Sequence, residues 1–188
     1  MLSFITVFLT SMIPVNSLSF LSVGDWGAAM LDPYHAQNVK SVVSAMKSEY
    51  DSEFTLNTGD NFYYCGIQNI SDKQVDIDFI QQFGSLQQKW YNVLGNHDYG
   101  YNASAQTELN TIIPNWIMDA RYYMKQIESN IILFALDTNP CIQDYRNDNP
   151  YYWDPCGSEY PTCSLDDTND DFEGECKFHE NILTQDCT

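Results

Sequence analysis

Lysine and arginine are scarce in this sequence. The 188-residue chain has 8 Lys and Arg against 26 Asp and Glu, which gives a formal net charge of −18 at pH 7. Such an excess of acid argues against a nucleic-acid partner and against binding to an anionic membrane surface. It does not exclude phosphate substrates, because a metal ion bound at one place can outweigh a diffuse negative field.

Several common motifs are also missing. The chain has no GxGxxG, no P-loop, no GxSxG, no CxxC pair and no internal repeat. These absences argue against a dinucleotide site, a P-loop nucleotide site, a serine-hydrolase elbow and a cysteine-rich zinc site. His179 is followed by Glu180, but the second His of HExxH is lacking, so it is not expected to bind zinc.

Long apolar runs are absent as well. Residues 1–17 carry no charge and are mostly apolar, yet they are too short to span a bilayer comfortably. We interpret them as a signal peptide, which predicts a secreted or a lysosomal or vacuolar protein. The alternative is a buried first strand that begins near Ile5.

The cysteines agree with export. There are six, and an even number in a secreted chain favours disulfides, with 15 possible pairings. Five of them follow residue 140, so residues 141–188 are predicted to form a cysteine-rich, acidic loop region. A calcium loop at 166–175 is disfavoured because EF-hand spacing fails there. Asn69 and Asn102 begin glycosylation sequons, which matter only in an exported chain.

What remains is typical of one globular α/β domain. Hydrophobic residues make up 44% of the chain and aromatic residues 14%, enough for one sizeable core. Strand-like and helical patterns alternate, which predicts a largely parallel, covered sheet. The predicted strands are 19–23, 54–57, 90–94, 122–124 and 131–136, and the predicted helices are 33–50, 76–83 and 104–111.

Three of these strands end in Gly followed at once by a polar residue. The pairs are Gly24-Asp25, Gly59-Asp60 and Gly95-Asn96. Because binding sites in α/β sheets lie at the carboxyl ends of strands, three such ends predict one convergent site. Ordinary turns are the alternative for any single pair. Carboxylate and amide oxygens, with the nearby phenol of Tyr63, are hard donors suited to hard cations.

The segments GDWG, GDNFYY, GNHDYGYNASAQ and LDTNP, in this order, resemble the purple acid phosphatases. The match is best to their small tartrate-resistant type, within the calcineurin-like metallophosphoesterases. The resemblance implies an α-β-β-α sandwich of the metallophosphoesterase type. It also implies that residues 18–188 are the N-terminal portion of one such domain, with the C-terminal part of the fold missing from this chain.

The resemblance also implies a role for each matching residue. Asp25 would bind a ferric ion, Asp60 would bridge two metals, and Tyr63 would bind the ferric ion and produce the purple charge-transfer band. Asn96 would bind the divalent metal, which is iron, zinc or manganese. His97 would contact the phosphoryl group or protonate the leaving alkoxide, with a metal-held hydroxide as nucleophile. The substrate would be a small phosphomonoester or a phosphoprotein, hydrolysed best at acid pH.

Each of these residues also has a structural alternative. Asp25 or Asp60 could cap a helix, Tyr63 could be a core aromatic and His97 a buried, hydrogen-bonded histidine. Asp98 is expected to support a ligand, Asp137 to be structural, and His35 to be structural or solvated.

The chain departs from the family in its ligand set. Members use seven protein ligands, of which four match here, and the other three are histidines from segments beyond residue 188. We therefore expect little or no activity from this chain alone, an apolar sheet face without cover and an open sheet edge. Two alternatives remain. One is a related metallophosphodiesterase, which Tyr63 disfavours. The other is a secreted, non-catalytic remnant of the fold that acts as a binding protein.

Overall fold

A computed structural model describes residues 18–141 and Cys156. The predicted signal peptide and most of the predicted cysteine-rich acidic region lie outside the described residues. No helix in the described part of the chain is long and apolar enough to cross a membrane.

A four-stranded parallel sheet forms the centre of the described fold. Its strands are β1 (Phe20–Val23), β2 (Phe54–Asn57), β3 (Lys89–Asn92) and β4 (Trp116–Ile117), paired in that order. The strands are in register, since Val23 pairs with Asn57 and Asn57 with Asn92. The carboxyl ends of β1, β2 and β3 therefore lie side by side. The predicted α/β class with a parallel sheet is confirmed, and the short β4 is an addition to the predicted strands.

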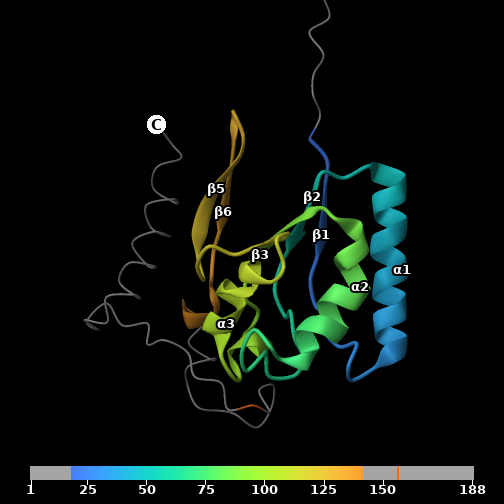
Figure 1. Ribbon diagram of the computed structural model, residues 1–188. Helices are drawn as coiled ribbons and strands as arrows, with labels where there is room; N and C mark the ends of the chain where they lie inside the picture. Colours follow the sequence, from blue (N-terminus) through green and yellow to red (C-terminus); the bar gives the residue numbers. More distant parts are fainter. Residues whose placement is uncertain (1–17, 142–155, 157–188) are drawn as a thin grey trace, which may run out of the picture.

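Helices cover one side of this sheet (Figure 1). Helix α1 (Pro33–Tyr50) has the bounds predicted from its apolar spacing. The Asp32 side chain caps its first turn by accepting from the backbone N–H groups of Tyr34 and His35, and Pro33 fixes φ at the first helical position.

The second predicted helix is less regular than expected. A π-helical turn η1 (Val75–Ile80) leads into α2 (Gln81–Phe83) and the 3₁₀ turn η2 (Gly84–Leu86). Val75, Asp78 and Phe79 lie on its inner face, where all three are buried.

The remaining elements follow β3. They comprise η3 (Asn96–Tyr99), α3 (Ala103–Thr107), η4 (Leu109–Thr111), β5 (Tyr123–Glu128), β6 (Ile131–Ala135) and η5 (Asn139–Cys141). The strands β5 and β6 pair with each other as an antiparallel hairpin, separate from the parallel sheet. The hairpin lies on the opposite side of the molecule from α1 (Figure 1). The hairpin exposes the apolar side chains of Met124, Ile132 and Phe134.

An aromatic cluster fills the space between the sheet and its helical cover. Trp26 is 1% exposed and is in ring contact with Phe62, Phe79, Phe83 and Trp90 among others. Burying each such side chain contributes about 1.5–3 kcal/mol. Because Trp26 and Phe62 belong to the loops that follow β1 and β2, this core anchors the two loops that carry the candidate site.

Candidate metal centre at the strand ends

The loops after β1, β2 and β3 approach one another without intervening side chains. The backbone N–H of Asp25 donates to the carbonyl of Gly59 at 3.1 Å. A Cβ atom on Gly95 would lie 2.1 Å from the backbone nitrogen of Asp60, so only glycine fits there. Asp25 and Asp60 both have left-handed backbone, with φ of 57° and 52°. Such strained residues often mark functional sites, and here the strain is repeated at two equivalent strand ends.

The predicted ligands from three strand ends line one pocket. Asp25, Asp60 and Asn96 lie in the wall of a cavity of about 290 Å³. The segment after β6 also lines this cavity, with Thr138 and Asn139.

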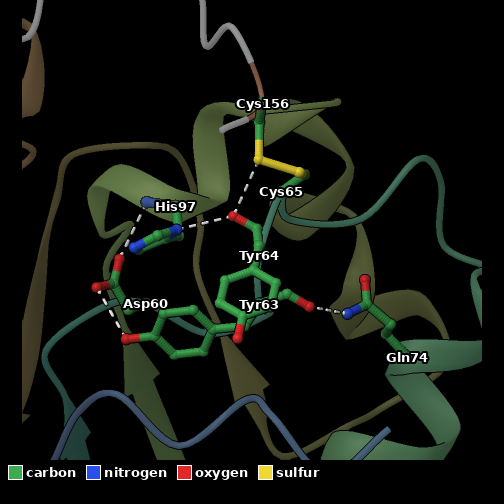
Figure 2. The surroundings of a disulfide bond; sticks show 7 residues. All are labelled: Asp60, Tyr63, Tyr64, Cys65, Gln74, His97 and Cys156. Carbon is green, nitrogen blue, oxygen red and sulfur yellow. Dashed lines mark hydrogen bonds between the residues drawn. A yellow bond between two sulfur atoms is a disulfide. The ribbon is translucent and has the colours of Figure 1, made fainter. Parts of the chain in front are cut away.

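Tyr63 joins the two carboxylates. Its hydroxyl donates to Asp25 Oδ1 at 2.8 Å and lies 3.1 Å from Asp60 Oδ2 (Figure 2 shows the Asp60 contact). Burial is the largest cause that raises the pKa of Tyr63 above its ordinary value, and the adjacent Asp25 and Asp60 raise it further. The protein by itself therefore holds Tyr63 as a neutral phenol, and only a strongly charged cation could displace its proton.

Asn96 and His97 point in different directions. Asn96 lines the pocket, whereas the His97 ring packs against Tyr63 with ring centroids 4.6 Å apart. The backbone N–H of His97 donates to Asp60 Oδ1 at 3.1 Å, and His97 Nδ1 lies 2.8 Å from the Tyr64 carbonyl oxygen (Figure 2). A carbonyl oxygen only accepts, so this contact requires a proton on Nδ1 and leaves Nε2 as the ring nitrogen that can exchange a proton with another group.

Asp98 ties the loops after β2 and β3 together. Its fully buried carboxylate accepts from the backbone N–H groups of Asn61, Phe62 and Gly95, and from the Gln106 side chain at 2.8 Å. Burial raises the pKa of Asp98 to about 7, and the hydrogen bonds from Asn61, Gly95 and Gln106 oppose that rise. The residue expected to support a ligand thus holds the Asp60 loop against the Asn96 loop.

Asp137 supports the part of the pocket lining that follows β6. It is fully buried and accepts from Arg121 at 2.9 Å, from the Tyr99 hydroxyl and from the Asn139 backbone. The Asn139 side chain in turn donates to the Leu94 carbonyl at 3.0 Å. Asp137 therefore has the structural role expected for it and fixes the Thr138-Asn139 wall against the end of β3.

A further support was not foreseen from the sequence. Gln74 donates to the Tyr63 carbonyl at 2.5 Å (Figure 2) and lies 3.5 Å from Asp78 Oδ2. The other oxygen of Asp78 accepts from the Met30 backbone at 2.6 Å. This pair connects η1 to the loops that carry Tyr63 and Asp25. Neither side chain lies in a recognisable motif, so no sequence signal marked them.

The donor set suits one of the metals implied by the resemblance. Across the described residues, no three His, Cys, Asp or Glu side chains form a metal group. The cluster instead combines two carboxylates with a phenol, and the amide of Asn96 lies in the same pocket. Hard oxygen donors converging within 2.8–3.1 Å fit a hard, highly charged cation such as ferric iron. His35 is not part of this cluster, and its Nε2 is buried without a hydrogen-bond partner among the described residues.

Comparison with known proteins identifies the family of the chain. The calcineurin-like phosphoesterase family model matches residues 18–179. Purple acid phosphatase 4 of Arabidopsis thaliana is 36% identical over 149 residues, which cover 74% of this chain and 42% of the relative. Purple acid phosphatase 7 of the same plant is 33% identical, over 73% of this chain and 43% of the relative. Tartrate-resistant acid phosphatase type 5 of Homo sapiens is 32% identical, over 65% and 41%.

A solved structure with a partial likeness is among the matches. It is described as GAP50, the anchor in the inner membrane complex of Plasmodium, and it matches with 25% identity and a TM-score of 0.45 over 62% of this chain and 39% of its own.

The chain spans about 40% of the length of the curated relatives it matches. The resemblance to the purple acid phosphatases is confirmed by these relatives, and the family match covers most of the sequence. The chain therefore belongs to the calcineurin-like phosphoesterase family.

Proposed function

We propose that a protein containing this chain is an acid phosphatase that hydrolyses phosphomonoesters at a binuclear centre of ferric iron and a divalent metal. The observation that carries the proposal is the Tyr63 hydroxyl, held within hydrogen-bond distance of both Asp25 and Asp60. A phenol is a poor ligand for an ordinary divalent ion, because its proton is hard to remove, but it suits a ferric ion. The similarity to purple and tartrate-resistant acid phosphatases supports the same reading.

The two metals, when bound, supply the Lewis acidity that activates water and neutralises charge on the phosphoryl group. Asp25 and Tyr63 would hold the ferric ion, Asn96 the divalent ion, and Asp60 both. Asp60 is suited to a shared position, because its two oxygens already face different partners, Tyr63 on one side and the His97 backbone on the other. The three further histidines implied by the resemblance would complete the ligand set.

His97 would act on the substrate through Nε2. Its Nδ1 proton is retained by the Tyr64 carbonyl, so a proton for the leaving alkoxide has to come from Nε2 of the protonated ring. The ring is held in place by its packing on Tyr63, next to the carboxylates that would bind metal.

We also propose that residues 1–17 are a signal peptide and that the protein is secreted or reaches a lysosome or vacuole. A disulfide between Cys65 and Cys156 supports an oxidising compartment. Asn69 and Asn102, the two sequon residues, are both exposed, which fits glycosylation.

The test compares Tyr63→Phe with Tyr64→Phe in a protein that contains this chain together with the three further histidines, loaded with ferric iron and zinc. The loaded parent protein is expected to absorb in the visible range, because a phenolate on ferric iron gives a charge-transfer band. Tyr63→Phe should lose the band and most activity on p-nitrophenyl phosphate. Tyr64→Phe is the matched control, since Tyr64 is the adjacent residue, is 58% exposed and has no hydroxyl contact with Asp25 or Asp60.

Three results would contradict the proposal in different ways. A band that survives Tyr63→Phe would remove Tyr63 from the ligand set. Faster hydrolysis of bis-p-nitrophenyl phosphate than of the monoester would favour the phosphodiesterase alternative. Failure to retain any metal after dialysis would favour the non-catalytic binding protein.

A further inference from the structure

The disulfide between Cys65 and Cys156 lies directly beside the candidate catalytic histidine. It joins residues 91 positions apart in the sequence, with a Cα–Cα distance of 5.5 Å. Cys65 is two residues after Tyr63, in the loop that follows β2. The bridge therefore anchors a distant part of the chain to the loop that carries one of the candidate ligands (Figure 2).

The Tyr64 carbonyl connects the bridge to His97. Its oxygen lies 2.8 Å from His97 Nδ1 and 3.2 Å from Cys156 Sγ. A bonded sulfur has no proton to donate, so the second contact is one of packing, and His97 is the donor to this carbonyl. The sulfur and the imidazole thus confine the carbonyl between them.

The bridge also lies close to Gly100, the residue after the turn that carries His97. A Cβ atom on Gly100 would lie 2.7 Å from Cys156 Cβ and 2.8 Å from Cys65 Cβ. Gly100 directly follows η3, which begins at Asn96. On the other side of Cys65, a Cβ atom on Gly66 would lie 2.6 Å from the Asp98 carbonyl oxygen. The disulfide therefore holds the segment that contains Tyr64 in close contact with η3.

We propose that the Cys65–Cys156 disulfide positions His97. The disulfide acts through the Tyr64 carbonyl, which keeps the proton of the neutral His97 ring on Nδ1 and leaves Nε2 facing the substrate. The inference rests on the proposed function for the role of His97 in catalysis. Its structural part, the tautomer and orientation of the ring, can be measured without any catalysis. A bridge that served stability alone would have no effect on the tautomer.

The experiment removes the bridge with the double substitution Cys65→Ala and Cys156→Ala. Protein labelled with ¹⁵N-histidine is studied by long-range ¹H–¹⁵N NMR at about pH 8.5, where an ordinary imidazole is neutral. The His97 signals are assigned with His97→Gln. Parent protein should show His97 protonated on Nδ1, and the double variant should shift the ring toward a mixture with the Nε2-protonated form. In a metal-loaded protein that contains this chain together with the three further histidines, kcat for a phosphomonoester should fall about tenfold with little change in KM, because a misplaced proton donor affects the chemical step.

Two controls separate positioning from stability. Val43→Ala truncates a buried residue on α1, away from the bridge, and should lower stability without changing the His97 tautomer. If the double variant does not fold, Gly100→Ala keeps both cysteines and pushes a methyl group into the bridge, and it should shift the tautomer in the same way. Gly84→Ala is its control, since a Cβ atom there meets only an Ile80 methyl at 3.7 Å.

An unchanged His97 tautomer in a folded double variant, or in Gly100→Ala, would overturn the inference. A shifted tautomer in a protein without phosphatase activity would support the positioning role and refute the proposed function instead. A shifted tautomer with unchanged kcat would overturn the catalytic part of the inference.

Discussion

Asp78 makes the stability of this protein depend on pH. The side chain is fully buried and accepts from the Met30 backbone and from Gln74. Burial raises its pKa to about 6; the hydrogen bonds from Met30 and Gln74 oppose that rise, and the negative charge of Asp72 adds to it. The folded state therefore binds a proton more tightly than the unfolded state, in which an ordinary aspartate has a pKa of about 3.9.

The sign of the effect follows from this difference. Between about pH 4 and pH 6 the folded protein carries more of this proton than the unfolded chain, so the free energy of unfolding falls as pH rises through that window. A shift of about two pKa units corresponds to about 3 kcal/mol as an upper limit, and screening by nearby solvent reduces it, so we expect about 1–3 kcal/mol. Asp78→Asn is neutral at every pH and should lose this part of the dependence.

The assay is urea unfolding followed by tryptophan fluorescence from about pH 4 to pH 8. The difference in unfolding free energy between Asp78→Asn and the parent protein isolates the contribution of Asp78, because Asp98 and the other carboxyls are present in both proteins. Asp76→Asn is the matched control, since Asp76 lies on the same element and is exposed. A difference in unfolding free energy that stays constant from about pH 4 to 6.5 would refute the reasoning.

Two further substitutions test the packing around the site. Gly59→Ala should cost roughly 2–4 kcal/mol of unfolding free energy, because its φ is +103° and the new Cβ would lie 2.6 Å from a backbone nitrogen of the adjoining loop. Gly84→Ala should be near neutral, and equal effects of the two would contradict the argument. Arg121→Met should cost about 3–5 kcal/mol, since it leaves the buried Asp137 carboxylate without its cation. Lys125→Met, which breaks an exposed pair, should cost less than about 1 kcal/mol in the same urea titration, and a reversed order would count against the ranking.

Local patterns in the sequence were sufficient for the first half of the sheet. The apolar spacing of α1, with Asp32 and Pro33 at its start, predicts both of its ends, and β2 has the predicted bounds as well. The strands predicted at 122–124 and 131–136 exist with other bounds, as β5 (Tyr123–Glu128) and β6 (Ile131–Ala135). Their pairing as a separate antiparallel hairpin depends on tertiary packing, which periodicity does not report. The π-helical turn of η1 has the same apolar pattern as an ordinary helix, so its type was not predictable.

The candidate ligands were also marked in the sequence, by Gly followed by Asp or Asn at three strand ends. Their support was less visible. Asp98 follows His97 in a recognised segment. Gln74 and Arg121 belong to no motif, and their partners lie far along the chain: Gln74 contacts Tyr63, 11 residues away, and Arg121 contacts Asp137, 16 residues away. The Cys65–Cys156 pair was one of many possible pairings, and only the folded geometry selects it. Contacts between distant segments carry no local signature, which is why these residues were missed.

The order of strands in the sheet has a consequence for how the protein is made. The spatial order β1-β2-β3-β4 is also the order of synthesis, so each strand leaves the ribosome next to a partner that is already available. The loops that carry Asp25, Asp60 and Asn96 are complete before β4 is translated. Cys156 is translated only after all of these loops. The Cys65–Cys156 disulfide can therefore form after the carboxyl ends of β1, β2 and β3 have come together.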